Sequence, residues 1–372
     1  MNRPKKRPLR LGQIGWLHDD RGPGYETVAW CDINEAKLKK AGTQAPHMAL
    51  YTDYRAMLQQ ESLDAVFISS PNAVHAQQAI AALAAGVHVF LEKPMGITPE
   101  ECRAVCDAAR RSGRHCVVDF ELRISTMTRR LLEIIRRNEF GPLRRLEFFH
   151  HRGGWLEEGN GLWRTRPEFS GGLFLMEPIH EVDLFRFLAG EIAAVRGFAG
   201  PRVLPHYQFE DHAGVFFEFR SGAAGFLFTS HTHSAQVPDP KQWNPDLGHD
   251  MSLIATFEQG AVGIHPLTQR IIFNRFEPYP PGTRGVRVVF DHIEDYEPAG
   301  LQAFSHDIAG MRREFIRRLL ADEPPMIAIE DAYQSHEACF AIEESLRKGG
   351  ERIPLPLSNP SRTKHRRSRG TH

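Results

Sequence analysis

The stretch His88-Val89-Phe90-Leu91-Glu92-Lys93-Pro94 sets the fold that we expect for this chain. Its first four residues are mostly apolar, and a charged pair and a proline end the run. A strand of a parallel sheet is buried on both faces and is nearly continuously apolar. Ligands of open α/β sheets bind just beyond the carboxyl ends of such strands, where a desolvated lysine can act as acid and base. The alternative is an ordinary strand end with a solvated glutamate–lysine pair.

The residues around this stretch alternate between strand-like and helix-like patterns. Strands are expected at 9–14, 27–31, 65–69, 88–91 and 116–120, with helices at 35–40, 53–60, 74–85 and from 98 onward. Thr98 and Glu101 form a capping-box pattern around Pro99, and Gly86 is suited to end the preceding helix. Strands that alternate with helices of this length predict a doubly wound parallel sheet.

The pattern changes after Arg123. A helix is expected at 126–138, and strand-like runs with turn signals recur from 193 to 290. Their alternation predicts an antiparallel sheet with one covered face, followed by helices at 304–320 and 329–348. The fold class is therefore α/β, with a Rossmann-like domain at 9–122 and an α/β domain with a large, mainly antiparallel open sheet at 123–355. Residues 1–8 and 356–372 are expected to be disordered basic ends.

Length and composition are those of a soluble globular protein. The 372 residues are 41% hydrophobic and 25% charged, which suits about two domains. No apolar run reaches the about 18 residues of a membrane span, and no signal peptide is recognisable. The five cysteines include no Cys-x-x-Cys pair, so we expect reduced thiols in a cytoplasmic protein.

The distribution of charge argues against a nucleic-acid partner. The formal charge is zero, but residues 1–10 and 359–372 hold ten basic residues and no acid, which leaves the rest at −10. An acidic body is unsuited to a polyanion, and the basic ends are expected to be solvated tails. Neither a nucleic acid nor a membrane is expected as a partner.

Several short motifs together resemble the Gfo/Idh/MocA family, which includes glucose–fructose oxidoreductase and inositol dehydrogenases. They are Ser70-Pro71-Asn72-Ala73-Val74-His75, Glu92-Lys93-Pro94, Trp163-Arg164-Thr165-Arg166-Pro167, Gly171-Gly172-Leu173, His180-Glu181-Val182-Asp183-Leu184, and Ile329-Glu330-Asp331-Ala332 with Glu344-Ser345. Each motif is short, but their order and spacing over residues 9–355 are fairly specific.

The resemblance implies hydride transfer between NAD(P) and a sugar, cyclitol or related polyol. It implies Lys93 as the catalytic acid and base, with His180 sharing the proton chemistry. It implies cofactor-binding roles for Gly15, Trp16, Asp32, Ser70, Pro71, Asn72, His75, Glu92 and Pro94, and substrate-binding roles for Arg123, Trp163, Arg164, Glu177 and Asp183. The acid at Asp32 favours NAD over NADP. A homo-oligomer formed through the open sheet is also implied.

The phosphate loop departs from the family pattern. Counted from Gly15, the second and third glycines of G-x-G-x-x-G are Leu17 and Asp20. Only eleven residues, 16–26, separate the first two strands, and they include Gly22-Pro23-Gly24. A parallel crossover usually needs a dozen or more residues, so the helix that presents the diphosphate site is expected to be shortened or absent. Asp19 and Asp20 would place negative charge near a diphosphate.

Two other features bear on the site. Met176 stands where many family members carry an aspartate, and a methionine cannot bind a substrate hydroxyl as a carboxylate does. His231 and His233 would share one face of a strand, which permits a metal site, but hydrogen-bonded or surface histidines are the favoured interpretation. No residue is therefore assigned to a metal.

Three functions remain open. The leading one is an NAD-dependent oxidoreductase acting on a sugar-like or cyclitol alcohol. The second is an enzyme with a retained cofactor that performs net non-redox chemistry, such as elimination or hydrolysis. The third is a non-catalytic protein that binds a sugar or a partner protein, which the altered loop favours and Glu92-Lys93-Pro94 disfavours.

Overall fold

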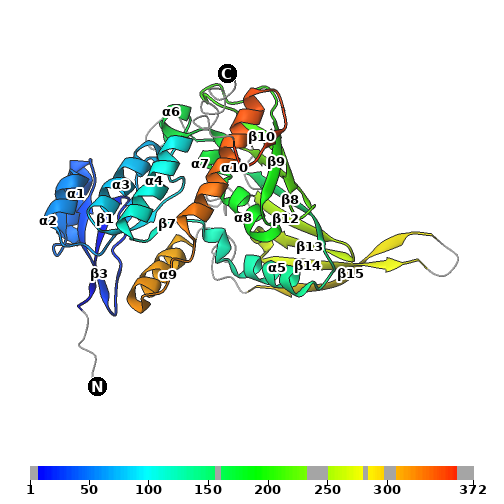
Figure 1. Cartoon of the computed structure of the whole chain (residues 1–372), viewed down its shortest axis with the longest axis horizontal. Helices are drawn as coiled ribbons and strands as arrows, with labels where there is room; N and C mark the ends of the chain where they lie inside the picture. The colour runs from blue at the N-terminus through cyan, green and yellow to red at the C-terminus, as the bar shows by residue number, and fades with distance from the viewer. Residues whose placement is uncertain (1–6, 156–160, 233–249, 280–283, 297–306, 358–372) are drawn as a thin grey trace, which may run out of the picture. The chain divides into compact units, whose positions relative to one another are not determined.

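The chain divides into two compact units (Figure 1). The computed structural model describes residues 7–155, 161–232, 250–279, 284–296 and 307–357. Unit 1 takes in the described parts of 1–124, 156–179 and 306–336, and unit 2 those of 125–155, 180–305 and 337–372. The sequence suggested a single boundary at 122/123, whereas unit 1 also contains two later segments.

Unit 1 contains a seven-stranded sheet in the order β2-β3-β1-β5-β6-β7, with β4 paired to β3. Every pair is parallel except β2 with β3, which confirms the predicted Rossmann-like sheet. The strands are β1 (Leu9–Gly15), β2 (Arg21–Gly22), β3 (Tyr25–Cys31), β4 (Ala49–Tyr51), β5 (Ala65–Ser69), β6 (His88–Leu91) and β7 (Cys116–Val118). The early helices are α1 (Glu35–Gln44), α2 (Tyr54–Gln60), α3 (His75–Ala84) and α4 (Pro99–Ser112), with 3-10 turns at Asn72–Val74 and Glu121–Arg123.

Local sequence signals explain where these helices begin. The Thr98 side chain accepts from the Glu101 N–H, and the Glu101 carboxylate accepts from the Thr98 N–H, so the predicted capping box is present. The side chains of Asn34 and Asp53 cap α1 and α2 by accepting from N–H groups of the first turn, without the reciprocal bond of a capping box. These caps orient the helices that follow the carboxyl ends of the parallel strands.

The connection from β1 to β3 contains no helix. Residues 16–24 form a short hairpin in which β2 pairs antiparallel with the start of β3. The Leu9 N–H donates to Gly24 O at 2.8 Å, and the Thr27 N–H donates to Asp20 O at 2.9 Å. The expectation of a shortened or absent helix is therefore confirmed. The adjacent parallel strands β1 and β3 are joined by this hairpin.

The two later segments belong to unit 1 because their side chains complete its core. These segments form α6 (Pro167–Ser170), α7 (Leu173–Met176), α9 (Ile308–Ala321) and the start of α10 (Ile329–Arg347). The Phe315 ring on α9 lies 5.9 Å from that of Phe67 and 5.7 Å from that of Phe90. A covering of this kind is required because both faces of a parallel sheet are apolar.

Unit 2 contains a nine-stranded sheet in the order β15-β14-β13-β12-β8-β11-β10-β9-β16. All neighbours are antiparallel except β8 and β11, so the predicted mainly antiparallel sheet is confirmed. The strands are β8 (Leu143–His151), β9 (Ile192–Phe198), β10 (His212–Phe219), β11 (Ala224–Ser230), β12 (Asp250–Phe257), β13 (Gly260–His265), β14 (Arg270–Pro278), β15 (Val286–Asp295) and β16 (Ile353–Pro354). Its helices are α5 (Thr126–Arg137), α8 (Ile179–Ala189) and the end of α10, and the β14–β15 hairpin extends past the other strands (Figure 1).

The two faces of this sheet differ in character. On one face the Phe185 ring of α8 lies 5.3 Å from that of Phe217, and both are buried. The alternate residue Phe216 points to the other face and is 54% exposed. One face is thus covered by helix within this unit, and the other carries exposed aromatic side chains.

All five cysteines are buried, and none forms a disulfide. They are Cys31, Cys102, Cys106, Cys116 and Cys339. Burial raises the pKa of Cys31 and of Cys106 to about 12, and it raises the thiol pKa values of Cys102 and Cys116 as well. These thiols are therefore protonated and unreactive in the folded protein.

Several expectations concern residues outside the described ranges. They include His233, His249, residues 1–6 of the basic N-terminus and 358–372 of the basic tail. Among the described residues, no helix combines the length and the apolar character that a bilayer crossing requires.

The backbone contact between β1 and β5 yields a first prediction. Gly15 has φ +89°, and a Cβ there would lie 2.3 Å from Ser69 O. We expect Gly15→Ala to lower the free energy of unfolding by about 1–3 kcal/mol more than Gly86→Ala does, because the backbone must move apart. Gly86 is the matched control, with φ +78° and no atom within 4 Å of its added Cβ. Equal losses in urea denaturation would show that the β1–β5 contact tolerates a methyl group.

Candidate functional site

Lys93 lies two residues beyond the end of β6, at the carboxyl edge of the parallel sheet. Its ammonium nitrogen, Nζ, donates to Met176 O at 2.7 Å, and the side chain is half-buried. Because this bond uses one N–H group, a neutral amine would keep its lone pair for a proton. The arrangement suits a lysine that exchanges protons with a ligand.

His75 fixes the backbone around Lys93. The His75 ring is buried, with Nδ1 2.7 Å from Pro94 O and Nε2 2.7 Å from Ser70 O. Burial lowers its pKa and the charge of Lys93 acts in the same direction, while the two backbone carbonyl oxygens oppose this shift. Each ring nitrogen faces a carbonyl oxygen, which can only accept a hydrogen bond. His75 thus connects the ends of β5 and β6.

His336 of α10 supports the same segment and was missed in the sequence. The buried Met95 N–H donates to His336 Nε2 at 2.8 Å, and His336 Nδ1 lies 2.7 Å from Ala332 O. Since Nε2 accepts, Nδ1 carries the proton that is donated to Ala332 O. The partners are 241 positions apart, and no local pattern indicates such a contact.

Asn72 ties the β5 end to α6 and α7. Its side-chain amide donates to Ser170 O at 2.9 Å, and its Nδ2 lies 3.7 Å from Met176 Sδ. Met176 therefore contacts the site through its backbone oxygen and its sulfur, where a carboxylate was expected from the family pattern. Asn72 is buried, and its amide acts as a bridge within unit 1.

A pocket of about 520 Å³ opens beside the carboxyl ends of β1, β3 and β5. Its walls also include Lys37 of α1, Gln77 and Gln78 of α3, and Trp163 with Arg164. Five of the nine residues predicted to bind a cofactor line it, namely Gly15, Trp16, Asp32, Ser70 and Pro71. Trp163 and Arg164, predicted as substrate residues, line this pocket as well.

Asp32 is the acid of this pocket. Its Oδ1 accepts from the Asn34 N–H at 2.8 Å, and its Oδ2 lies 3.3 Å from Lys37 Nζ. Each carboxylate oxygen can accept a second hydrogen bond, so hydroxyl groups of a ribose have acceptors here. The position at the end of β3 matches an acid that binds the adenosine ribose in Rossmann folds.

The diphosphate end of the pocket lacks the usual cradle. No helix follows β1, so there is no helix N-terminus to offer N–H groups and a positive dipole end. The first N–H after the strand, that of Trp16, donates to Ser69 O at 3.0 Å. The residues present therefore fit the adenosine half of a dinucleotide, and its diphosphate would need other partners.

The two acids of the hairpin are neutralised locally. Arg21 Nε donates to Asp19 Oδ1 at 2.9 Å, and this bond lowers the pKa of Asp19. Arg312 of α9 forms an ion pair with Asp20, and its guanidinium lies 4.8 Å from the Phe67 ring centre. Burial, aided by the charge of Arg312, lowers the pKa of His18 to about 4, so this histidine is neutral. The expected repulsion by Asp19 and Asp20 is thereby reduced.

The remaining predicted site residues are not among the residues that line this pocket. Arg123 is buried and pairs with Asp331 at 2.6 Å, while Glu177 is buried just after α7. Glu92 and Pro94 flank Lys93. His180 and Asp183 belong to α8 in unit 2, where His180 is half-buried and Asp183 is buried. Their roles stay predictions.

Asp119 is a second residue that the sequence did not single out. It follows β7, its N–H donates to Leu91 O at 2.9 Å, and it is buried. Neither carboxyl oxygen has a hydrogen-bond partner among the described residues. Burial, together with the nearby carboxyls of Glu92 and Glu121, raises the pKa of Asp119 well above its usual value. A carboxyl group with a raised pKa therefore lies next to β6, the strand that Lys93 follows.

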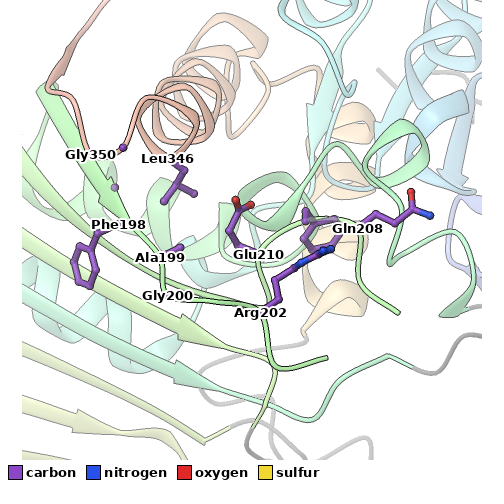
Figure 2. A pocket seen from close by; sticks show the side chains of 11 residues that line it. Phe198, Ala199, Gly200, Arg202, Gln208, Glu210, Leu346 and Gly350 are labelled. Carbon is purple, nitrogen blue, oxygen red and sulfur yellow. The ribbon is translucent and has the colours of Figure 1, made fainter. Parts of the chain in front are cut away.

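Within the described ranges, no group of three or more histidine, cysteine or acidic side chains is placed to hold a metal. His231 is buried, with Nδ1 3.1 Å from the Tyr207 hydroxyl. Unit 2 has a pocket of about 420 Å³ between the 197–200 backbone and the end of α10 (Figure 2). Its charged residues, Arg202 and Glu210, are exposed or half-buried, so it offers no desolvated reactive group.

The chain thus combines a Rossmann-like unit, which has a pocket at its strand ends, with a second unit built on a large open sheet. This combination is typical of nucleotide-dependent enzymes with two domains. Residues 13–120 match the model of the oxidoreductase family with an NAD-binding Rossmann fold, and residues 128–262 match the GFO/IDH/MocA C-terminal domain. The chain therefore belongs to the Gfo/Idh/MocA oxidoreductase family.

Its relatives have different activities in their names. The chain is 25% identical to the scyllo-inositol 2-dehydrogenase (NAD(+)) of Bacillus subtilis over 94% of this chain and 95% of that protein. It is 31% identical to a glycosyl hydrolase family 109 protein of Shewanella baltica over 42% of this chain, and the match spans only 38% of that protein. The WlbA dehydrogenase of Bordetella pertussis, crystallised with NADH and UDP-GlcNAcA, has the same fold, with TM-score 0.77 and 23% identity over 96% of this chain and all of that chain.

The raised pKa of Asp119 predicts a specific pH dependence of stability. A folded-state pKa above the unfolded value means that the folded state binds more protons, so stability falls as pH rises from about 4 toward the folded pKa. We expect Asp119→Asn to remove this fall. The difference in unfolding free energy between variant and wild type should grow by up to about 1.4 kcal/mol per pH unit.

Urea denaturation at several pH values from 5 to 8 measures this difference. The control is Asp107→Asn, because Asp107 lies on the surface beside Arg110 and has no buried carboxyl to lose. A constant difference between Asp119→Asn and wild type would mean that Asp119 ionises normally in the fold.

Proposed function

We propose that this protein is an NAD(H)-dependent oxidoreductase that acts on a secondary alcohol of a sugar, cyclitol or related polyol. The observation that carries the proposal is Lys93, held by Met176 O at the edge of a sheet whose neighbouring strand ends line a ligand pocket. The family and the name of the Bacillus subtilis relative support this substrate class.

We assign the adenosine part of the cofactor to the pocket, with Asp32 as the acceptor for its ribose hydroxyls. Glu92, Pro94, Asn72 and His75 would support the nicotinamide end through the backbone that they fix. Bound NAD supplies the hydride acceptor or donor of the reaction. NADP is disfavoured because a 2′-phosphate would meet the Asp32 carboxylate.

The protein's own chemical contribution is proton transfer. In alcohol oxidation, neutral Lys93 would take the hydroxyl proton at Nζ while Met176 O holds the amine in place. We assign His180 as the residue that shares this proton. Arg123, Glu177 and Asp183, with Trp163 and Arg164, stay candidates for positioning the substrate.

A second function is favoured by the glycosyl hydrolase relatives. An enzyme that retains its cofactor could oxidise a sugar, eliminate a group beside the resulting ketone and then reduce the product, with no net redox change. Purified protein that absorbs in the reduced-nicotinamide band and turns over without added NAD would support this alternative. A third possibility, binding without turnover, is favoured only by the hairpin at 16–24.

Loss of the Lys93 amine should separate binding from turnover. We expect Lys93→Met to lower kcat by at least about 100-fold, because general acid–base catalysis contributes that much, while the NADH dissociation constant changes little. Activity is measured by NADH formation with a panel of cyclitols and sugars, and binding by nicotinamide fluorescence. Lys348→Met, which removes an exposed lysine paired with Glu344, is the control. Full turnover by the Lys93 variant would remove it from the mechanism.

We also propose a homo-oligomer formed through the aromatic patch of unit 2, and a cytoplasmic location that suits its reduced thiols. The aromatic patch consists of Phe149, Phe198, Phe216 and Phe226 on the face opposite α8. The Phe216 and Phe226 rings lie 5.0 Å apart, and Phe198 lies 5.9 Å from Phe216. Phe198 and Phe216 are exposed and Phe149 and Phe226 are half-buried; contiguous aromatic groups with this exposure are typical of an interface, and a symmetric contact would cover them.

A charge in the aromatic patch tests this assembly. We expect Phe216→Glu to shift the protein to monomers in sedimentation velocity, since a buried carboxylate without a partner opposes association. Phe169→Glu, at an exposed position of unit 1, should leave the oligomeric state unchanged. A wild-type protein that sediments as a monomer would refute the proposal directly.

A further inference from the structure

Two large apolar side chains stand exposed at the same pocket of unit 1. Trp16 is 62% exposed and Ile33 is 91% exposed, the highest values for large apolar residues among the described part of this unit. Both line the pocket beside the ends of β1 and β3. An exposed tryptophan at a ligand pocket suggests a surface that is covered when a ligand binds.

These two residues follow the ends of paired strands. Ile14 pairs with Cys31 at the end of the parallel β1–β3 ladder, and Trp16 and Ile33, two positions beyond them, both line the same pocket. Trp16 has a fixed backbone, because its N–H donates to Ser69 O at 3.0 Å and the preceding Gly15 O accepts from Trp30 Nε1 at 2.7 Å. The indole is therefore presented by a rigid backbone, which reduces the entropy lost on binding.

The surrounding groups indicate what would cover them. Asp32 directly follows β3, lines the same pocket and offers acceptors for vicinal hydroxyls. The same region lacks a helix N-terminus for a diphosphate. A ligand with a flat aromatic ring joined to a ribose matches this combination, because bases stack on tryptophan and ribose hydroxyls donate to carboxylates.

We propose that Trp16 and Ile33 clamp the purine ring of an adenine nucleotide, so that this pocket holds its ligand mainly through base and ribose. This inference deepens the proposed function and rests on its nucleotide site. In this arrangement, the apolar contact of Trp16 takes the place of the hydrogen bonds that a phosphate-binding helix N-terminus would supply. Affinity should therefore depend little on the phosphates of the ligand and little on salt.

Calorimetry with AMP, NADH, nicotinamide mononucleotide and inorganic pyrophosphate tests the clamp in the full-length protein. We expect Trp16→Ala to weaken AMP and NADH by the same factor, about 10- to 100-fold, as stacked bases lose when the aromatic group is removed. Trp16→Phe should restore most of the affinity. Ile33→Ala should weaken both ligands less, and nicotinamide mononucleotide should respond to neither substitution.

The controls distinguish this inference from the proposed function. Phe169→Ala removes an exposed aromatic outside the pocket and should change no affinity, and thermal denaturation checks that each variant is folded. AMP should quench wild-type tryptophan fluorescence, and Trp16→Phe should lose that quenching. AMP binding without NADH binding would support the clamp while defeating the proposed oxidoreductase. Unchanged AMP affinity in Trp16→Ala, or pyrophosphate that displaces AMP at equal concentration, would overturn the clamp.

Discussion

A parallel sheet needs cover on both faces, and unit 1 meets this need without a helix between its first two paired strands. The late helix α9 supplies contacts instead. Its Arg312 lies over the Phe67 ring and pairs with Asp20 of the hairpin, and its Phe315 packs against Phe67 and Phe90. Because a segment near residue 312 completes a sheet that begins at residue 9, unit 1 is discontinuous in sequence. The absence of a helix after β1 also shapes the pocket. The hairpin at 16–24 follows β1 instead, and the Trp16 side chain lies where a helix would begin.

Local patterns predicted the elements well, and distant contacts set the limits of that prediction. The capping residues Thr98 and Glu101 lie three positions apart, so their sequence contains the whole interaction. The short spacing from Gly15 to Thr27 was likewise enough to predict that no full helix fits there. By contrast, the contact between Met95 and His336 depends on the tertiary fold, which a single sequence does not report. The boundary at 122/123 missed the later segments of unit 1 for the same reason, because α6, α7 and α9 join it through packing.

The site has two parts: the segment around Lys93, which is held by several hydrogen bonds, and the ends of β1 and β3, where apolar side chains are exposed. Around Lys93 the backbone is held by His75 and His336, and the amine itself is bonded to Met176 O. Such bracing keeps a proton-transferring group within the narrow geometry that catalysis needs. The β1–β3 side has two exposed apolar side chains, Trp16 and Ile33. The family resemblance included Lys93, His75 and Trp16 among the site residues, whereas the contact of His336 and the 62% exposure of the Trp16 side chain became visible only in the folded chain.

The buried thiols are natural probes of local unfolding in this protein. Four cysteines lie in unit 1, at β3, α4 and β7, and Cys339 lies in the part of α10 that belongs to unit 2. Each is shielded from solvent, and the raised pKa values of the four in unit 1 keep their thiols protonated while the fold is closed. The rate at which a given cysteine is alkylated therefore reports how often the structure around that cysteine opens. Mass spectrometry of a partially labelled sample would rank the two units by their resistance to opening, without any engineered probe.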